Sequence, residues 1–350
     1  MNGNGTFRNM SPRVSVVIST FNRLPLLQEL LDALTRQTLP ANRFEVIVVD
    51  DGSREPAAPA LEQRKDPFKL TVITQANAGA AAARHAGIMA ATGEVVVITD
   101  DDMLVPEDFL EEHLRAHDAG HTLVLGQIAA DHSLEEKPLF ERFHAEQLAR
   151  FVARYRAQPT AVRGVMVCTG NVSFRRDDYL WVGGFDKSLG RSEDRELGVR
   201  LQKAGAKLYF AEKARTMHRS DHTELSVWMK RNYNYGVYDS RIHHKHPDRL
   251  DADPWHFLFL VNPISRGVLL AAVASPEVGK LLSRAAYAAA ETVDKARDVH
   301  PIFERAAIAG ATLTYGIEYF RGVREEAGSL MRALEDLGNH AWRSFNSQPV

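Results

Sequence analysis

Short apolar runs rich in β-branched residues alternate with segments of helical periodicity between Val14 and about residue 128. This alternation is typical of a mostly parallel sheet whose strands are joined by covering helices. The runs that predict strands are VSVVIST, EVIVVD, LTVITQ, EVVVITD and TLVLGQI. Leucines at helical spacing follow the first run, and Pro25 suits an early helical position, so we expect the chain to start as a β-α-β unit.

A less regular pattern follows over residues 129–220. The stretch LFERFHAEQLARFVARY predicts a helix, VMVCTGNVSFRR has the pattern of a strand, and GGFDKSLGRSEDRELGVRLQKAG predicts a loop and then a helix that ends at Gly205. The stretch HTELSVWMKRNYNYGVYDSRI predicts a further helix. After Pro254 we expect mainly helices, at about residues 276–298 and 301–337.

These patterns divide the chain into three parts. Residues 1–12 lack an apolar core of signal-peptide length and are predicted to be a flexible leader. Residues 13–245 are expected to form an α/β domain with a first half over 13–128 and a second half over 129–245. Residues 246–350 are expected to form a mainly helical C-terminal region.

Composition and charge narrow the class of protein. The chain has 350 residues, of which 45% are hydrophobic and 25% charged, which is ordinary soluble composition. A net charge of -2 gives no electrostatic case for nucleic acid, whose binders show a basic excess or stripe. Cys168 is the single cysteine, which excludes an intramolecular disulfide framework and a multi-cysteine metal site, so we expect a cytoplasmic protein.

The most apolar late stretch is PWHFLFLVNPISRGVLLAAVA. His256, Asn262, Pro263 and Arg266 interrupt it, so it falls short of the ~20 uninterrupted apolar residues that a spanning helix needs. We therefore predict no transmembrane helix, whereas peripheral contact with the inner face of a membrane remains open.

Three consecutive aspartates, Asp100 to Asp102, follow the fourth strand candidate directly. Adjacent carboxylates raise one another's pKa unless positive charge compensates them. Aspartate is common where a strand leaves a sheet, so a polar turn is one interpretation. The other is a site for Mg²⁺ or Mn²⁺, which prefer oxygen ligands and commonly join a carboxylate to substrate phosphates.

A second acidic pair, Asp50 and Asp51, ends the second strand candidate. Ligands of such sheets collect beyond the carboxyl ends of the strands, which here also carry STFNR and TDDD. A turn capped by Ser53 is the structural alternative. An aspartyl-phosphate phosphatase is not indicated, because it needs two aspartates separated by one residue after its first strand. A phospho-receiver domain of about 120 residues would not need the rest of the chain.

Other polar residues have two interpretations each. Arg84 lies in an alanine-rich helical stretch, where it could pair with a phosphate or be a solvated surface residue. Glu193 and Asp194 follow Ser192, as capping and the helix dipole favour, but they could equally present a carboxylate to a cleft. A lone histidine such as His218 is more often structural than a metal ligand.

Taken together, these segments resemble glycosyltransferase family 2, the inverting nucleotide-sugar transferases of GT-A fold. The resemblance covers roughly residues 13–240. It is carried by an ordered series of stretches, which are VSVVISTFNR, EVIVVDDGS, NAGAAAARHAG, GEVVVITDDD, TGNVSFRR and GGFDKSLGRSEDRELGVRLQKAG, with His218 after them. It implies a Rossmann-like, mostly parallel sheet flanked by helices, with a nucleotide-sugar-binding first half and an acceptor-binding, catalytic second half.

The resemblance also implies roles for single residues. Asp194 matches the general base. Asp101 and Asp102 match the metal-binding acidic cluster, with His218 as a further metal or diphosphate contact. The residues expected around the nucleotide sugar are Thr20, Phe21, Asn22, Arg23, Asp51, Asn77, Gly79, Arg84, Asp100 and Asp101. The residues expected on the acceptor side are Gly170, Asn171 and Glu193.

The implied activity is a metal-dependent transfer of a sugar from a nucleotide-diphosphate sugar, with UDP favoured, to an acceptor hydroxyl by a single displacement. Mn²⁺ or Mg²⁺ is the expected cofactor. The acceptor could be a glycan, a lipid-linked molecule or a small molecule. The C-terminal helices could cover the acceptor site, form a homodimer contact or lie on a membrane surface.

Two other function classes compete with this one. A catalytically silent module that binds a nucleotide sugar or a partner would be marked by a missing base or metal carboxylate, and neither is missing here. A sugar-phosphate nucleotidyltransferase should carry a Gly- and Arg-rich phosphate loop after its first strand, whereas STFNRLP contains no glycine.

Overall fold

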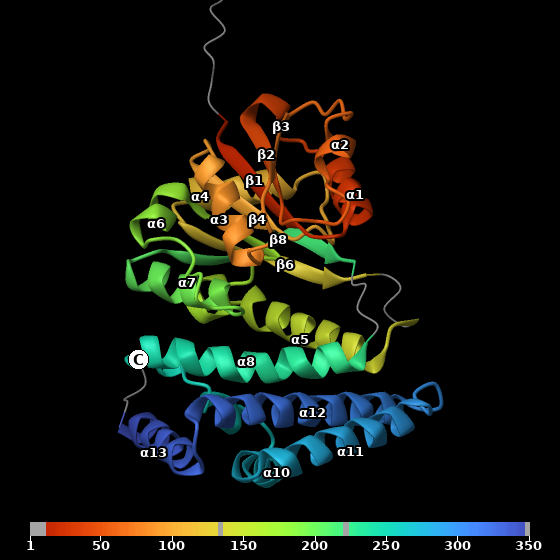
Figure 1. Ribbon diagram of the computed structural model, residues 1–350, viewed down its shortest axis with the longest axis vertical. Helices are drawn as coiled ribbons and strands as arrows, with labels where there is room; N and C mark the ends of the chain where they lie inside the picture. Colours follow the sequence, from red (N-terminus) through yellow and green to blue (C-terminus); the bar gives the residue numbers. More distant parts are fainter. Residues whose placement is uncertain (1–11, 132–135, 220–223, 347–350) are drawn as a thin grey trace, which may run out of the picture. The chain divides into compact units, whose positions relative to one another are not determined.

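The computed structural model describes residues 12–131, 136–219 and 224–346, so the predicted leader lies almost entirely outside the described residues. The chain forms two compact units (Figure 1). The first consists of Met1–Asp131 with Leu148–Ser220, and the second of His132–Gln147 with Asp221–Val350. The domain boundary predicted at residue 245 therefore falls inside the second unit.

The first unit is built on a mixed sheet. Its strands have the order β3-β2-β1-β4-β7-β6-β8-β5. Their bounds are β1 Val14–Thr20, β2 Phe44–Asp50, β3 Lys69–Thr74, β4 Val95–Thr99, β5 Met103–Leu104, β6 Leu123–Ala130, β7 Asn171–Arg175 and β8 Leu208–His218. Strands β3, β2, β1 and β4 run parallel to one another, whereas β7 pairs antiparallel with both β4 and β6.

Helices cover both faces of this sheet (Figure 1). They are α1 Leu24–Leu34, α2 Ala58–Leu61, α3 Ala80–Ala90, α4 Phe109–Asp118, α6 Arg176–Trp181 and α7 Glu193–Lys203, together with the second half of α5 Leu139–Arg156. Successive residues of β1 alternate between two cores, because side chains of a strand point to opposite faces. Val16 and Ile18 pack with leucines of α1, whereas Val17 packs with Ala83 and Ile88 of α3.

The structure confirms the predicted α/β class and its mostly parallel first half. It differs at two strands. Only the second half of VMVCTGNVSFRR is extended, because a 3-10 turn, Gly164–Met166, precedes β7. Strand β8 was not predicted, and its pairing with β6 shifts register between Gly126 and Gln127, which interrupts the alternation by which a strand is identified from sequence.

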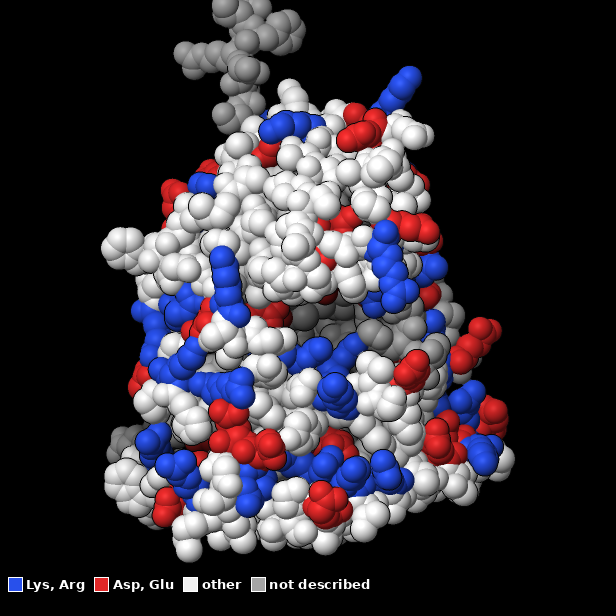
Figure 2. All heavy atoms as spheres, in the orientation of Figure 1, with Lys and Arg blue, Asp and Glu red and all other residues white. Residues whose placement is uncertain are grey.

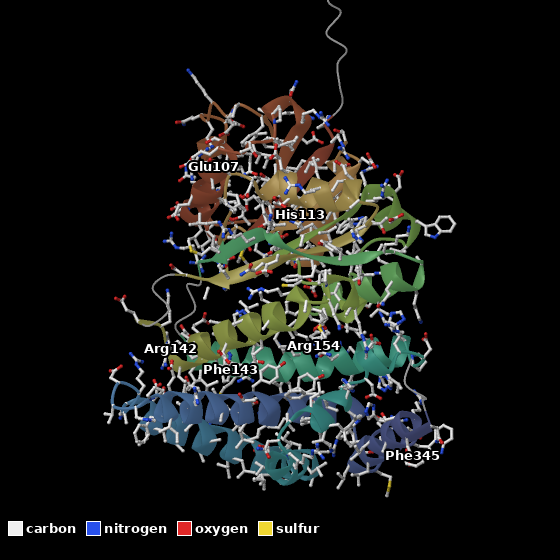
Figure 3. The ribbon with its side chains drawn as sticks, turned by 180° about the vertical axis from the view of Figure 1, so that it is seen from behind. Glu107, His113, Arg142, Phe143, Arg154 and Phe345 are labelled. Carbon is white, nitrogen blue, oxygen red and sulfur yellow. The ribbon has the colours of Figure 1, made fainter. Side chains whose placement is uncertain are left out.

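The second unit is helical. Its helices are the first half of α5, α8 Leu225–Lys245, α9 His256–Leu260, α10 Pro263–Ala274, α11 Pro276–Asp294, α12 Pro301–Ala327 and α13 Leu330–Asn346. The helix predicted over 301–337 is interrupted by Gly328, which has φ +73° and ends α12 in the left-handed conformation that favours glycine. Phe143 of α5 packs against Trp228 of α8 (Figure 3).

Helices α8 and α12 pack unusually closely at a pair of glycines. A Cβ atom on Gly236 would lie 1.9 Å from the carbonyl oxygen of Tyr319. A Cβ atom on Gly322 would lie 2.0 Å from the carbonyl oxygen of Tyr233. Because backbone oxygens cannot move aside as a side chain can, any larger residue would force the two helices apart.

The surface of the molecule mixes charges of both signs. Basic and acidic side chains lie next to one another on the face drawn in Figure 2, which agrees with a net charge of -2. Among the described residues, no helix combines the length and the hydropathy that crossing a membrane requires.

We expect Gly236→Ala to destabilise the helical unit, although alanine is the better helix former. The added methyl group meets a backbone oxygen at 1.9 Å, and the expected loss is roughly 2 to 3 kcal/mol in the free energy of unfolding. Gly267→Ala in α10 is the matched control, because no atom lies within 4 Å of its Cβ position. That variant should gain about 0.5 to 1 kcal/mol. Urea unfolding of both variants checks this, and stabilisation by both would contradict the close contact.

Candidate functional site

The aspartate run between β4 and β5 is surrounded by positively charged and hydrogen-bonding groups. Arg84 donates from Nη2 to Asp100 at 2.6 Å. The Thr20 hydroxyl donates to Asp101 at 2.7 Å, and Nη1 of Arg23 donates to Asp102 at 2.8 Å. The structure thus joins the end of β1, the loop after it and helix α3 at the carboxyl end of β4.

His218 reaches the same cluster through the pairing of β5 with β8. Met103 lies opposite His218 in that antiparallel pair, and the N–H of Arg219 donates to the carbonyl oxygen of Asp102 at 2.8 Å. This register brings Nε2 of His218 to 3.4 Å from a carboxylate oxygen of Asp102. The predicted metal residues Asp101, Asp102 and His218 are therefore neighbours in space.

The pKa values of Asp101 and Asp102 are shifted in opposite directions. Burial raises the pKa of Asp101 to about 6, although the Thr20 hydroxyl and the Arg23 charge oppose the shift. Burial would also raise the pKa of Asp102, but the hydrogen bond and charge of His218, with the charge of Arg23, outweigh burial and lower it. Asp102 is thus the aspartate of this pair that the protein holds ionised.

The donor set of this cluster fits a hard divalent cation in part. Oxygen Oδ1 of Asp102 is buried and has no hydrogen-bond partner in the structure, so one carboxylate oxygen remains free as a ligand. No group of three or more His, Cys, Asp or Glu side chains among the described residues has an arrangement that could hold a metal ion. Arg23 instead supplies a positive charge beside Asp101 and Asp102.

The loops after β1 and β2 are tied together beside this cluster. The N–H of Asn22 donates to the hydroxyl of Ser53 at 2.8 Å, and the N–H of Arg54 donates to Oδ1 of Asn22 at 2.8 Å. Asn22 has φ +57°, and both Asn22 and Phe21 are exposed. Phe21 therefore offers an exposed aromatic face next to a fixed backbone.

Asp50 and Asp51 have different structural roles. Both oxygens of Asp50 accept backbone N–H groups of its own loop, from Ser53 and Ala57, so Asp50 closes the turn. Asp51 accepts from the side chain of Gln75 at 2.8 Å and from the N–H of Gly79 at 2.8 Å. Asp51 thereby fixes the loop before α3.

This loop carries two of the predicted nucleotide-sugar residues. Asn77 is exposed, and Gly79 precedes α3 with φ +88°, a conformation that favours glycine. The N–H of Ala78 also donates to Asp51, at 2.9 Å. The predicted residues Asp51, Asn77 and Gly79 therefore lie on one connected loop system.

Arg84 links the aspartate run to α7. Its Nη1 donates to Glu193 at 2.8 Å while its Nη2 donates to Asp100. Burial would lower the pKa of Arg84, but the charges of Asp100 and Glu193 outweigh it and raise the pKa. The interpretation of Arg84 as a solvated surface residue is wrong, because its side chain is 9% exposed.

Asp194 lies in the first turn of α7, directly after Glu193. Its Oδ2 accepts from the N–H of Thr169 at 3.1 Å, and its Oδ1 accepts from the N–H of Arg195 at 2.8 Å. Burial and the neighbouring Glu193 carboxylate raise the pKa of Asp194 to about 6. Ser192 makes no capping hydrogen bond with its side chain, so Asp194 serves the helix end in its place.

The residues predicted for the acceptor side have separate environments. Gly170 lies beside the aspartate run, where an added Cβ atom would be 2.9 Å from Met103 and 3.5 Å from Asp100. Glu193 is paired with Arg84. The Asn171 side chain is buried. Its Nδ2 donates to the backbone carbonyl groups of Gln127 and Ala214, and its Oδ1 accepts a hydrogen bond from Nε2 of His113 at 2.9 Å. Asn171 therefore connects strands, and its predicted role at the acceptor has no exposed side-chain atom to support it.

Two groups of polar residues were not predicted from the sequence. Thr169 bonds to Asp194, and the only sequence signal was its position directly before the Gly170–Asn171 pair. His113 and His117 of α4 form a buried network with Ser173 (Figure 3 labels His113). Burial lowers the pKa of His113 to about 3, so this histidine is a neutral structural group.

Comparison with known proteins identifies relatives of this chain. The family model of Glycosyl transferase family 2 matches residues 15–183. The chain is 31% identical over 220 residues to the validoxylamine A glucosyltransferase of Streptomyces hygroscopicus subsp. jinggangensis, covering 55% of this chain and 52% of that relative. The chain thus spans about half the length of the curated relatives that it matches first.

Two solved structures have a similar fold. A mannosyltransferase from Pyrobaculum calidifontis, in complex with GDP-Man and Mn²⁺, gives a TM-score of 0.56 at 24% identity and covers 87% of each chain. Residues 1–349 of TarS from S. aureus, in complex with UDP-GlcNAc, give a TM-score of 0.56 at 17% identity, with 87% of this chain and 90% of the other covered. At these identities the likeness concerns the fold.

The family match includes the polar residues that follow β1, β2 and β4, whereas Asp194 and His218 lie beyond residue 183. The observed sheet, with parallel β3, β2, β1 and β4 and an antiparallel β7, agrees with the GT-A arrangement. The matched segment, residues 15–183, is therefore similar to members of Glycosyl transferase family 2.

Proposed function

We propose that the protein is a metal-dependent, inverting glycosyltransferase that moves a sugar from a nucleotide-diphosphate sugar to an acceptor hydroxyl. The observation that carries the proposal is the convergence of Asp51, the Asp100–Asp102 run and Asp194. Thr20 bonds to both Asp51 and Asp101, and Arg84 joins Asp100 to Glu193, the neighbour of Asp194. These groups would supply two functions that the reaction needs. One is a site for a cation that stabilises the leaving group, and the other is a base that deprotonates the nucleophile.

The donor is proposed to be a UDP-sugar. Relatives of this chain are named glucosyltransferases, and one structural neighbour holds UDP-GlcNAc while another holds GDP-Man. These names support a nucleoside diphosphate sugar in general. The exposed Phe21 face and the loop fixed by Asp51 provide the proposed contacts to the base, and Asp100 is proposed to approach the ribose.

Asp101 and Asp102, with His218, are the residues that we assign to Mn²⁺ or Mg²⁺, and their side chains would have to rearrange to bind it, because they are not arranged as a metal site in the structure. The free Oδ1 of Asp102 supports this assignment. A bound divalent cation would offset the negative charge of the departing diphosphate. Arg23 contacts the same two carboxylates, so its guanidinium would have to move for a cation to bind to both of them.

Asp194 is proposed to be the general base. A carboxylate with a pKa of about 6 is a better proton acceptor near neutral pH than an ordinary aspartate. The acceptor oxygen attacks the anomeric carbon from the face opposite the diphosphate, its proton passes to Asp194, and the bond from carbon to the diphosphate oxygen breaks. One displacement of this kind inverts the anomeric configuration.

The acceptor, the cytoplasmic location and a homodimer through the C-terminal helices stay predictions. The acceptor is a hydroxyl of a glycan, a lipid-linked molecule or a small molecule. Helix α13 exposes the apolar side chains of Met331, Trp342 and Phe345 (Figure 3 labels Phe345), which supports contact with a membrane surface or a second copy.

We expect UDP to raise the melting temperature far more in the presence of Mn²⁺ or Mg²⁺ than after chelation. Without a cation the diphosphate would meet the negative charge of Asp100 to Asp102, which repels it. The Asp101→Ala, Asp102→Ala double variant should lose the metal-dependent part of the shift. A thermal-shift titration checks this, and a metal-dependent shift that persists in the double variant would move the cation site elsewhere.

Replacing Asp194 by asparagine should slow transfer by something like ~10² to 10⁴-fold, because the proton acceptor is lost. Nucleotide affinity should stay close to that of the unmodified protein. The melting temperature should fall only modestly, since asparagine keeps one of the two oxygens that accept from Thr169 and Arg195. The control is Glu193→Gln, which keeps an acceptor for Arg84. An active Asp194→Asn variant together with an inactive Glu193→Gln variant would show that Asp194 is the wrong carboxylate and would assign the base to Glu193. Two active variants would exclude both Asp194 and Glu193 as the general base.

The turnover rate at saturating donor and metal should fall as the pH decreases below about 6. The pKa of Asp194 is raised, so its basic form is present above that value and is lost by protonation below it. The loss should approach tenfold per pH unit. The pH profile of single-turnover rates tests this, with nucleotide affinity measured at each pH to separate the titration of Asp101. A rate that is flat from pH 7 to pH 5 would exclude Asp194 as the base.

A further inference from the structure

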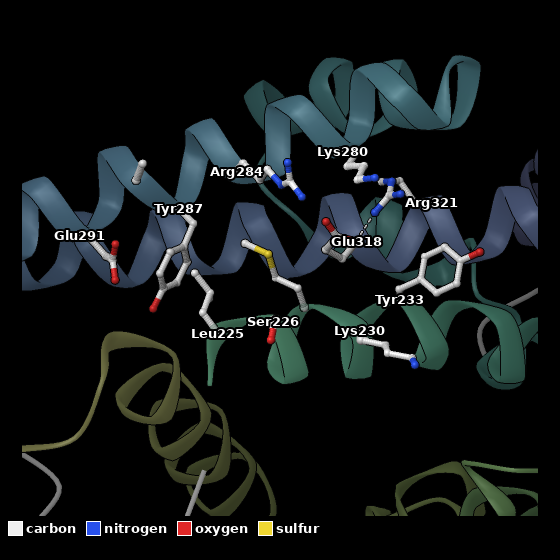
Figure 4. Close-up of a pocket in the computed structure, with 12 residues that line it drawn as sticks. Leu225, Ser226, Lys230, Tyr233, Lys280, Arg284, Tyr287, Glu291, Glu318 and Arg321 are labelled. Atoms are coloured by element: carbon white, nitrogen blue, oxygen red, sulfur yellow. Dashed lines mark hydrogen bonds and ion pairs between the residues drawn. The ribbon is translucent and has the colours of Figure 1, made fainter. Parts of the chain in front are cut away.

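The helical unit contains a cavity of about 770 Å³ that the proposed transfer reaction does not use. Three helices line it, as Figure 4 shows. Helix α8 contributes Leu225, Ser226, Met229, Lys230 and Tyr233, helix α11 contributes Lys280, Arg284, Tyr287, Ala288 and Glu291, and helix α12 contributes Glu318 and Arg321. A volume of this size is that of a small-molecule site, which usually measures about 300 to 1,000 Å³.

Positive charge in this cavity exceeds negative charge. Lys230, Lys280 and Arg284 make no hydrogen bond or ion pair within the described part of the chain. Glu291 is the one lining carboxylate that does not already bond to a lining cation. Three cations around one cavity repel one another, and a bound anion would relieve that repulsion.

The wall behind these cations is fixed by buried interactions. Glu318 is 4% exposed, accepts a hydrogen bond from Ser283 and pairs with Arg321. Arg321 also donates from Nε to the carbonyl oxygen of Pro276 at 3.0 Å, and its guanidinium lies 5.5 Å from the centre of the Tyr233 ring. Arg321 is therefore engaged with the protein, which leaves Lys230, Lys280 and Arg284 as the cations available to a ligand.

The other end of the cavity is less polar. Leu225, Met229 and Tyr287 line it, and Figure 4 shows Tyr287 and Leu225 next to each other, on the opposite side of Arg284 from Lys280 and Arg321. Tyr287 itself is anchored by packing against Trp228, with ring centres 5.8 Å apart. The cavity thus has a cationic end, and an opposite end with apolar and aromatic surface beside the Glu291 carboxylate (Figure 4).

We propose that this cavity binds an organic phosphate ester. Lys280 and Arg284, with Lys230, hold the phosphate, and Leu225, Met229 and Tyr287 contact its organic part. A phosphate monoester carries about 1.5 to 2 negative charges at neutral pH, which matches the excess of unpaired cations better than a single carboxylate does. The arginine fork is also suited to phosphate oxygens. Phosphate alone would leave most of the volume empty, so the ligand needs an organic part.

The test measures binding of hexyl phosphate to the full chain by isothermal titration, with hexanol and inorganic phosphate as comparison ligands. Hexyl phosphate should bind more tightly than either, and its affinity should fall as salt is added. The Lys280→Glu, Arg284→Glu variant should bind at least ~10-fold more weakly. Both side chains are exposed, so the variant should keep the wild-type melting temperature.

The matched control is the Lys295→Glu, Arg305→Glu variant, which changes net charge equally at exposed positions of the same unit that do not line the cavity. Its affinity for hexyl phosphate should change by no more than about 2-fold. UDP with Mn²⁺ should bind both variants as it binds the unmodified protein. If UDP with Mn²⁺ binds to none of the three proteins, that result contradicts the proposed transfer function. It does not contradict the proposed phosphate ester site.

A second arm of the experiment distinguishes a soluble phosphate ester from a lipid headgroup. Phosphatidylcholine vesicles with and without phosphatidic acid are sedimented with each protein. Binding that needs phosphatidic acid and is lost in Lys280→Glu, Arg284→Glu supports the site with a lipid ligand, and binding of hexyl phosphate alone supports it with a soluble one. Absence of binding in both arms, or an equal loss in the control variant, overturns the proposal.

Discussion

The site depends on one constraint, which is that three consecutive carboxylates at the end of a strand must be compensated by positive charge. In this chain the protein itself provides much of that charge. Arg84 pairs with Asp100, and Arg23 pairs with Asp102. Because these arginines come from a helix and from the loop after β1, the charge balance also determines how the loops at this side of the sheet are held.

The compensation is uneven, and this separates the roles of neighbouring residues. Asp102 has Arg23 and His218 beside it and keeps a lowered pKa, whereas burial raises the pKa of Asp101. Arg84 pairs with Glu193, while burial and Glu193 together raise the pKa of Asp194. Relative to an ordinary aspartate, the protein thus favours the ionised form of Asp102 and the protonated form of Asp194.

Much of the first half of the fold could be predicted from the sequence, because buried parallel strands are continuous apolar runs and their carboxyl ends are marked by polar residues. Thr20, Asp51 and the Asp100 to Asp102 run could be grouped for the same reason. The pairing of Arg84 with Glu193 could not, because it joins residues 109 positions apart through the folded topology. Strand β8, which brings in His218, was hidden by a register shift.

From the sequence, helix capping and catalysis were alternative roles for Asp194, but the structure shows that one does not exclude the other. Ser192, the residue that the sequence suggests as the cap, has φ +61° and makes no capping hydrogen bond. Asp194 instead accepts the N–H of Arg195 at the start of α7 and the N–H of Thr169 from a different segment. A carboxylate held on both sides by backbone donors has a fixed orientation, which a positioned base requires. The hydrogen bonds at the start of α7 therefore fix the orientation of Asp194, while burial and Glu193 raise its pKa against the effect of these hydrogen bonds.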